Sequence, residues 1–217
     1  MFKSDDRMAL PTKMSIENSD CRIRHRRSPE ASRANILAAA EAILLASGPQ
    51  DLKLVEVAKG AGVANATVLH HFGSIDGVQT ALMERMIRQL VDNVLSITVA
   101  EGQGAAFAGA GMLALFDAFE TQGAARLAAW LALTGEASRM TGVRGAVQEV
   151  IDARISQIDG VSAEVMGDFI LGCVTYALGV GLFGAPLGEL LGKPPGRARE
   201  VALGILQARL DAAARGA

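Results

Sequence analysis

Apolar residues recur at helical spacing along most of this chain, and the pattern predicts an all-α protein. A stripe with spacings of one, three and four residues extends from Ile36 to Leu44. The tripeptide Ser28-Pro29-Glu30 precedes it, and a hydroxyl cap, a first-turn proline and an early acid favour a helix start. Gly48-Pro49 should end this helix, because glycine commonly follows helix ends and proline cannot continue a helix.

Two short helices are expected next, from about Leu54 to Gly60 and from about Asn65 to Phe72. The tripeptide Ala61-Gly62-Val63 would form the tight turn between them, since Gly62 can take a positive φ at no steric cost. Two short helices across a glycine-containing turn are typical of a helix-turn-helix. Its small shared core would consist of Val57, Ala58, Val63, Val68 and Phe72.

The rest of the chain predicts longer helices. One extends from Ile75 to about Ala100 and turns inward Val78, Leu82, Met86, Leu90 and Val94. The others are expected near Ala105–Glu120, Ala124–Leu133, Val143–Ile158, Ala163–Phe183 and Arg197–Ala214. We therefore expect residues 1–27 to be a disordered basic arm, residues 28–74 a three-helix DNA-binding unit, and residues 75–217 a larger helical domain.

The composition agrees with helices: half of the residues are hydrophobic but only 4% are aromatic, so alanine and leucine dominate. The net charge of −2 divides unevenly, with 12 Lys/Arg against 10 Asp/Glu in residues 1–90 and 9 against 13 afterwards. The basic excess thus lies in the predicted DNA-binding part. Cys21 and Cys173 lack disulfide or zinc spacing, and a cytoplasmic location is expected.

One apolar stretch raises the question of a membrane. Residues Phe169 to Phe183 are continuously apolar, but 15 residues fall short of the roughly 18 to 20 that a span needs. Gly184 and Pro186 follow closely. The pattern favours a buried or interface helix and no membrane association.

Residues 33–82 resemble the DNA-binding domain of the tetracycline-repressor (TetR) family. The positions that carry the resemblance are Arg33, Ile36, Leu37, Ala39, Ala40, Gly48, Val57, Ala58, Ala61, Gly62, Val63, Thr67, His71, Phe72, Ser74 and Asp76. It implies a homodimeric regulator, usually a repressor, that binds double-stranded operator DNA and is released by a small molecule. The domain over residues 75–217 would then bind the ligand and dimerise.

By this resemblance, Asn65 to His71 form the recognition helix, and its amino end enters the major groove. A helix amino terminus offers free N–H groups and positive dipole to phosphate. Asn65 and Thr67 can bond base edges or phosphate, and the two histidines can donate to phosphate. The expected DNA-binding residues are Arg33, Lys53, Ala64, Asn65, Ala66, Thr67, His70 and His71.

The chain departs from the family pattern at four positions. Lys53 and Ala64 stand where members usually carry serine or threonine before the short helices, Leu69 replaces a usual tyrosine, and Ile75 replaces a frequent lysine. The lysine is a phosphate contact, which Lys53 can partly replace. The basic run CRIRHRR of the arm is either a solvated tail or a further phosphate or minor-groove contact.

Large rings among alanine and glycine suit an apolar effector cavity, although each ring alone is more typical of a core. The predicted ligand-binding residues are Phe107, Phe116, Phe119, Trp130 and Tyr176. The dimer interface is assigned to the last helix and to the preceding one, whose small residues Gly172, Gly179, Gly181 and Gly184 allow close approach.

Enzyme activity, a metal and a cofactor are not expected. The chain has no G-x-S-x-G motif and no phosphate-binding Walker loop. His70 and His71 are adjacent on a helix and point about 100° apart, which does not suit a metal site. Two other classes remain open: a sequence-independent DNA-coating protein, and a small-molecule carrier or enzyme with a degenerate helix-turn-helix.

Overall fold

The computed structural model describes residues 28–100, 105–135, 145, 147–149, 152 and 162–216. Every regular element in these residues is helical, so the all-α expectation is confirmed. The predicted arm, residues 1–27, and most of the predicted helix Val143–Ile158 lie outside the described residues.

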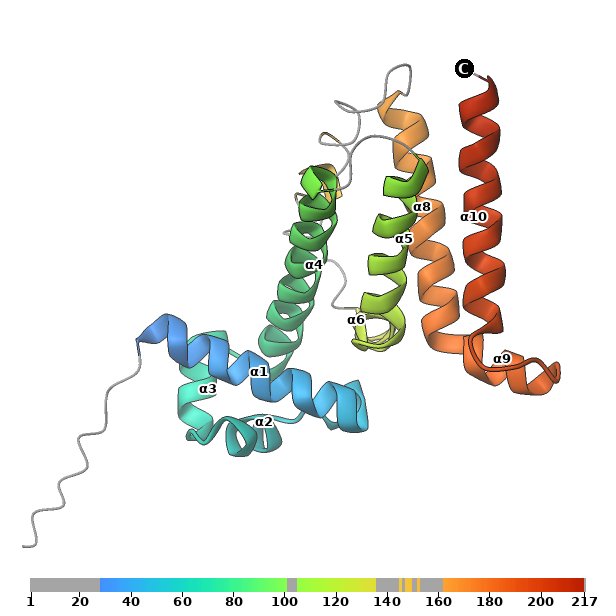
Figure 1. Cartoon of the computed structure of the whole chain (residues 1–217). Helices are drawn as coiled ribbons and strands as arrows, with labels where there is room; N and C mark the ends of the chain where they lie inside the picture. Colours follow the sequence, from blue (N-terminus) through green and yellow to red (C-terminus); the bar gives the residue numbers. More distant parts are fainter. Residues whose placement is uncertain are drawn as a thin grey trace, which may run out of the picture.

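The first unit contains α1 (Pro29–Ser47), the short 3-10 turn η1 (Pro49–Asp51), α2 (Leu54–Ala61) and α3 (Asn65–Phe72) (Figure 1). The Ser28 hydroxyl accepts a hydrogen bond from the Ala31 N–H at 3.1 Å, which is the expected cap. The pKa of Glu30 is lowered by its backbone hydrogen bond and by the Ser28 hydroxyl. Gly48 ends α1 with a φ of 94°, so both predicted helix signals are confirmed.

The inner face of α1 covers the two short helices. Ile36, Ala40 and Leu44 are fully buried, and they meet Val57 and Val68, which are also fully buried. Gly62 lies at φ 65°, in the left-handed region expected for the turn. Of the other predicted core residues, Ala58 is buried, while Val63 and Phe72 are half-buried and pack against the same core.

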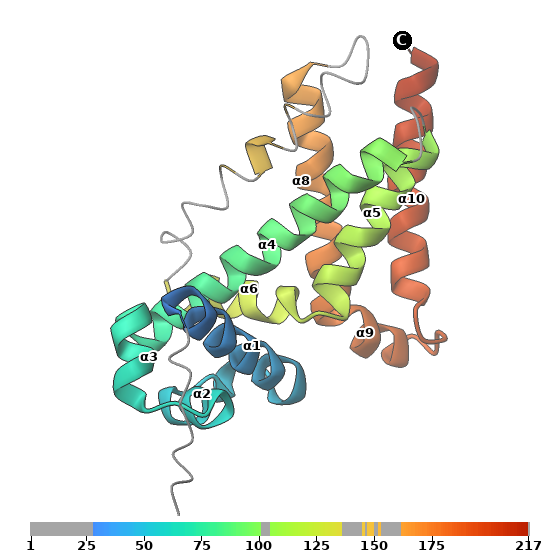
Figure 2. The same cartoon turned by 60° about the vertical axis from the view of Figure 1, so that its left-hand side comes forward.

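Helix α4 (Ile75–Ala100) rises from the first unit and runs beside α5 (Ala105–Glu120), as Figures 1 and 2 show. Four of its five predicted inward residues are buried and the fifth, Leu90, packs against the core. Helix α6 (Ala124–Leu133) crosses between the first unit and the longer helices (Figure 2). Buried residues from the first helices and from the last ones therefore share one continuous hydrophobic core.

The last part comprises α8 (Ala163–Gly179), a π-helical turn η3 (Val180–Gly184), α9 (Ala185–Leu190) and α10 (Arg197–Gly216). The predicted helix end at Phe183 is wrong, because the helical path continues to Leu190. Pro186 lies in the first turn of α9, where a missing N–H is tolerated. Gly181 within the π turn packs tightly on α5 and α6: an added Cβ would lie 2.8 Å from the Phe119 carbonyl oxygen and 2.7 Å from Ala125 Cβ.

This continuation lengthens the apolar segment noted in the sequence. Among the described residues, the stretch Ala163–Leu190 is long and apolar enough to cross a membrane, with 28 residues and a mean hydropathy of 1.8. Only 17% of its most apolar window is buried within the single chain. The outer side of this stretch is therefore largely exposed in the single chain.

Polar contacts join α1 to the helices above it. The Arg85 guanidinium on α4 forms an ion pair with Glu41 and lies 3.4 Å from the Leu37 carbonyl oxygen. Arg126 on α6 approaches the Leu45 carbonyl oxygen at 3.5 Å. The first unit is thus fixed to α4 and α6 by side chains that reach the middle and the carboxyl end of α1.

Candidate nucleic-acid interface

Helix α3 exposes its amino end and buries one of its sides in the core. Ala64, Asn65 and Ala66 are exposed, Thr67 is half-buried, and Val68 is fully buried in the core. The predicted DNA-binding residues of this helix therefore gather at its first turn. Leu69, which replaces the usual aromatic residue of the resemblance, is 41% exposed on the following turn.

Neither short helix has a side-chain cap at its amino end. Ala64 before α3 and Lys53 before α2 make no capping hydrogen bond. The first N–H groups of a helix have no intrahelical partner, and here no side chain satisfies them. The first turn of α3 thus offers N–H donors and the positive end of the helix dipole to an anion.

Lys53 lies at the start of α2 with an exposed side chain. Its ammonium group lies 3.5 Å from an Asp51 carboxylate oxygen, and 68% of its side chain is exposed. Such a loose surface pair costs little to break. Lys53 is therefore free to reach a phosphate, as the sequence predicts.

Arg33 is exposed, but its guanidinium contacts the end of α3. Its guanidinium Nη1 donates to the His71 carbonyl oxygen at 2.6 Å, and its Cζ lies 4.2 Å from the centroid of the Phe72 ring. Two residues further along α1, Asn35 Nδ2 donates to the Ala61 carbonyl oxygen at 2.7 Å. Helix α1 thus holds the carboxyl ends of both short helices, a role for Asn35 that the sequence reading missed.

The two histidines have different surroundings. His70 is exposed, while His71 is half-buried with its ring edge-on to Phe72 at 6.4 Å between centroids. The two imidazoles are themselves 5.4 Å apart and steeply inclined. In the described part of the chain, no group of three or more His, Cys, Asp or Glu side chains could hold a metal ion.

Ile75 has a structural reason to be apolar. It is half-buried and packs against the core at the start of α4. Two residues later, Gly77 lies directly against the end of α3: a Cβ there would be only 2.1 Å from the Phe72 carbonyl oxygen. The junction between α3 and α4 is therefore closely packed.

The predicted ligand-binding residues occupy different environments. Phe116 and Phe119 are buried in the core, Trp130 is half-buried on α6, and Tyr176 is 40% exposed on α8. The side chain of Phe107 lies outside the described residues. Among the described residues, none of these rings lines the cavity between α5 and α10, and their assignment as a ligand site stays a prediction.

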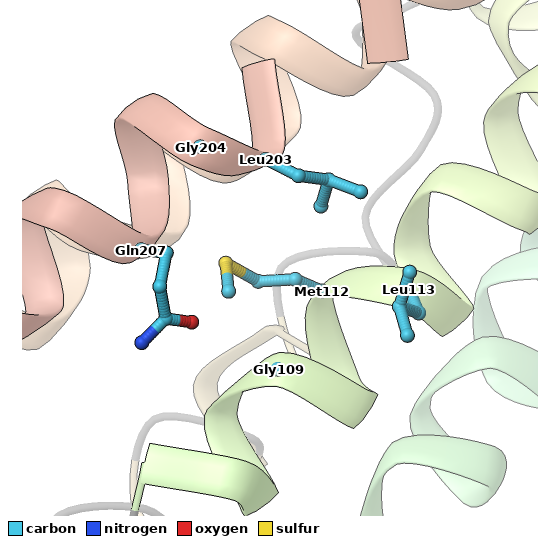
Figure 3. A pocket seen from close by; sticks show the side chains of 6 residues that line it. All are labelled: Gly109, Met112, Leu113, Leu203, Gly204 and Gln207. Carbon is cyan, nitrogen blue, oxygen red and sulfur yellow. The ribbon is translucent and has the colours of Figure 1, made fainter. Parts of the chain in front are cut away.

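A cavity of about 310 Å³ lies elsewhere, between α5 and α10 (Figure 3). The figure shows the Met112 side chain of α5 extending toward α10, where Gln207 is the one polar side chain of the lining. The helices beside it are held together by Arg199, whose guanidinium lies 2.7 Å from Asp117 and 3.4 Å from Glu120. This cavity could not be predicted from the sequence, because it forms between helices that are distant along the chain.

Cys173 belongs to the core side of α8 and is only 5% exposed. Burial raises the pKa of its thiol to about 11. The thiol is therefore protonated and weakly nucleophilic at neutral pH, in keeping with a small core residue.

Exposed large hydrophobic residues are concentrated on α8, η3, α9 and α10. Nine of the fourteen large hydrophobic residues that are exposed in the described chain belong to this part, so it differs from the rest of the surface. They are Val165, Leu171, Tyr176, Phe183, Leu187, Leu190, Leu191, Val201 and Ile205. We call them the α8–α10 face.

The glycines of this region divide into two groups. Gly181 and Gly184 pack inside the chain, the latter with an added Cβ 3.2 Å from Ala198 Cβ. An added Cβ at Gly172 or Gly179 would meet nothing within 4 Å. Only the second pair is open to a partner, which corrects the sequence-based view of all four as interface residues.

Comparison with known proteins agrees with this geometry. Residues 36–82 match the sequence profile described as "Bacterial regulatory proteins, tetR family". A search of curated proteins gives no significant match.

Several solved structures share the fold. A transcriptional regulator from Rhodococcus sp. Rha1 is 22% identical, with a TM-score of 0.61 over 85% of this chain and 96% of that one. A tetR-family transcriptional regulator from Streptomyces coelicolor is 21% identical, with a TM-score of 0.56 over 84% and 89%. The fatty acid degradation regulator FadR from Bacillus halodurans is 13% identical, with a TM-score of 0.54 over 80% and 95%.

These similarities confirm the resemblance deduced from the sequence. The sequence profile covers the helix-turn-helix, and the solved structures share the fold of most of the chain. Residues 36–82 are therefore similar to the tetR family of bacterial regulatory proteins, and most of the chain shares the fold of several solved regulators.

Proposed function

We propose that this protein is a ligand-responsive transcriptional repressor that binds operator DNA as a homodimer. The observation that carries the proposal is the amino end of α3, which is exposed, uncapped and backed by a well-packed helix-turn-helix. Asn65 and Thr67 supply hydrogen bonds to base edges or phosphate, and the helix dipole and Lys53 attract the DNA backbone. No enzyme activity is part of this proposal.

The α8–α10 face supports dimerisation. A single recognition helix contacts too few base pairs for useful specificity, and a two-fold pair reads two half-sites. A second copy of this chain that covers the face would bury its exposed leucines and Phe183, together with the outer side of the 28-residue apolar stretch. This occupant, rather than a membrane, suits a DNA-binding protein, and the proposal puts the protein in the cytoplasm.

Effector binding acts through α4 and α6. Both helices contact α1, and α4 continues directly from the recognition helix. A small apolar molecule within residues 75–217 that favours another arrangement of these helices changes the spacing of the two recognition helices. A tenfold loss of DNA affinity requires about 1.4 kcal/mol of coupling, within the usual range for allosteric proteins.

Selection from a random pool of DNA duplexes tests the proposal. The full chain should enrich one inverted repeat with half-sites about one helical turn apart. An apolar compound that raises the melting temperature should weaken binding to that duplex.

The rival classes give other outcomes. Salt-sensitive binding without any enriched sequence would indicate a DNA-coating protein. Ligand binding without any DNA binding would indicate a carrier with a degenerate helix-turn-helix.

A further inference from the structure

The two ends of α3 are held differently. Ala64 gives its amino end no capping side chain, whereas Arg33 reaches its carboxyl end from α1. At that end Gly73 donates its N–H to the Leu69 carbonyl at 2.8 Å, and Arg33 donates to the His71 carbonyl at 2.6 Å. A charged donor from another helix thus satisfies one of the carbonyls that a helix terminus leaves without intrahelical partners.

The same guanidinium also covers the last side chain of α3. Arg33 Cζ lies 4.2 Å from the Phe72 ring centroid, and Phe72 in turn packs against the core. A planar guanidinium can stack on a ring with its face while it donates hydrogen bonds from its edge, which an ammonium group cannot do. Arg33 therefore contacts both the backbone and the side chain at the end of α3.

We propose that Arg33 is a positioning residue that fixes the recognition helix to α1, in place of the direct DNA contact that the family resemblance suggests. The inference rests on the proposed function of α3. Because the amino end of α3 has no side-chain anchor, its approach to the groove is set from the opposite end, by Arg33 and by the packing of Phe72. Loss of this contact lets α3 reorient without removing a direct phosphate contact.

Salt dependence separates positioning from phosphate contact. Each phosphate contact adds about 0.9 to the slope of log affinity against log salt concentration. Removing a phosphate-bound arginine from both subunits therefore flattens the slope by about 2. Removing a positioning arginine lowers affinity and base discrimination but leaves the slope unchanged.

The experiment uses the full chain and a duplex that the wild-type protein selects from a random pool. In Arg33→Ala and Arg33→Lys, the affinity for the selected duplex relative to a scrambled one should fall about tenfold or more. Each variant loses the charge-assisted hydrogen bond to the His71 carbonyl, the stacking on Phe72, or both. The salt slope should stay at the wild-type value, and lysine should not rescue discrimination. Phe72→Leu, which keeps the carbonyl bond but removes the ring, should lose part of the same discrimination.

Hydrogen exchange of the α3 amides, without DNA, gives a second reading. Exchange should become faster in both Arg33 variants while the remaining helices keep their protection. Arg88→Ala, which removes an exposed arginine from α4, is the matched control and should change neither exchange in α3 nor discrimination.

Two results would overturn the inference. One is a salt slope that is flatter by about 2 in Arg33→Ala and returns to the wild-type value in Arg33→Lys, which identifies a phosphate contact. The other is unchanged exchange and discrimination in both variants. A wild-type protein that selects no duplex contradicts the proposed function instead, and the exchange measurement still decides whether Arg33 holds α3.

Discussion

At the residue scale, the contact between α3 and α4 depends on the missing side chain of Gly77. The Gly77 N–H donates to the Ser74 hydroxyl at 3.0 Å, so α4 begins immediately after α3 ends. This sharp connection brings the backbone of Gly77 against the Phe72 carbonyl. Helices α3 and α4 are therefore joined with almost no intervening space.

Gly77→Ala should destabilise the protein. Alanine normally favours a helix over glycine by up to about 1 kcal/mol, but here its Cβ would lie 2.1 Å from the Phe72 oxygen, so backbone must move. We expect a loss of about 1–3 kcal/mol in the free energy of unfolding, measured in urea. The control is Gly167→Ala in α8, where a Cβ meets nothing within 4 Å and alanine should be neutral or stabilising. Equal effects of the two substitutions would contradict the close contact.

At the element scale, the joint between α1 and α4 depends on a half-buried ion pair. The side chains of Arg85 and Glu41 are 23% and 32% exposed, and Arg85 Nε is buried without a hydrogen-bond partner. Solvent therefore screens this pair less than the exposed pair of Arg197 and Glu200 on α10, whose side chains are 53% and 66% exposed. The Arg85–Glu41 pair links α4 directly to α1 of the first unit.

A double-mutant cycle measures this joint. Glu41→Ala and Arg85→Ala should each lower the free energy of unfolding by about 1–2 kcal/mol, with a coupling energy of about 1 kcal/mol between them. The same cycle at Arg197 and Glu200 should give a coupling below about 0.5 kcal/mol, because that pair is exposed. The four proteins of each cycle are compared by urea unfolding. A coupling at Arg85–Glu41 as small as at the α10 pair would show that packing alone joins α1 to α4.

The same scale shows what the sequence could predict. The bounds of α3 follow from local signals, namely a turn glycine before it and Gly73 after it, and they are predicted correctly. The continuation of the helix past Phe183 could not be predicted, because Pro186 and its neighbouring glycines are normally stop signals. Here the tight packing of Gly181 on α5 and α6 overrides those signals.

The candidate site was predictable only where its residues are neighbours in sequence. The exposed first turn of α3 follows from the family pattern, but the bond from Arg33 joins residues 38 positions apart. The rings proposed for the effector were chosen by type, and composition does not reveal which side of a helix a ring occupies. Phe116 is consequently in the core, while Tyr176 is on the surface.

At the scale of the whole molecule, the α8–α10 face is the surface that the proposed dimer would bury. Leu171 is 65% exposed in the middle of α8, and Gly179 lies two turns further along the same helix with open space beside it. Gly181, by contrast, packs against α5 and α6 inside the chain. These positions allow substitutions that separate assembly of the dimer from folding of each subunit.

Leu171→Asp should dissociate the dimer while each subunit stays folded. A carboxylate on an apolar interface loses its hydration without gaining a partner, so we expect dimer affinity to fall by about 100-fold or more. Light scattering over a concentration series measures the affinity, and circular dichroism checks the fold. Leu133→Asp is the matched control, because Leu133 is 87% exposed at the end of α6 and outside the α8–α10 face, and it should leave the dimer intact.

Glycine substitutions complete the test. Gly179→Leu should weaken the dimer with little change in subunit stability, whereas Gly181→Leu should destabilise the subunit itself, since even a Cβ there approaches the Phe119 carbonyl oxygen to 2.8 Å. If Leu171→Asp and Gly179→Leu both remain dimeric with wild-type affinity, the interface lies elsewhere on the molecule. In that event binding of the wild-type protein to lipid vesicles, lost in Leu171→Asp, would identify the apolar stretch Ala163–Leu190 as a membrane-binding segment instead.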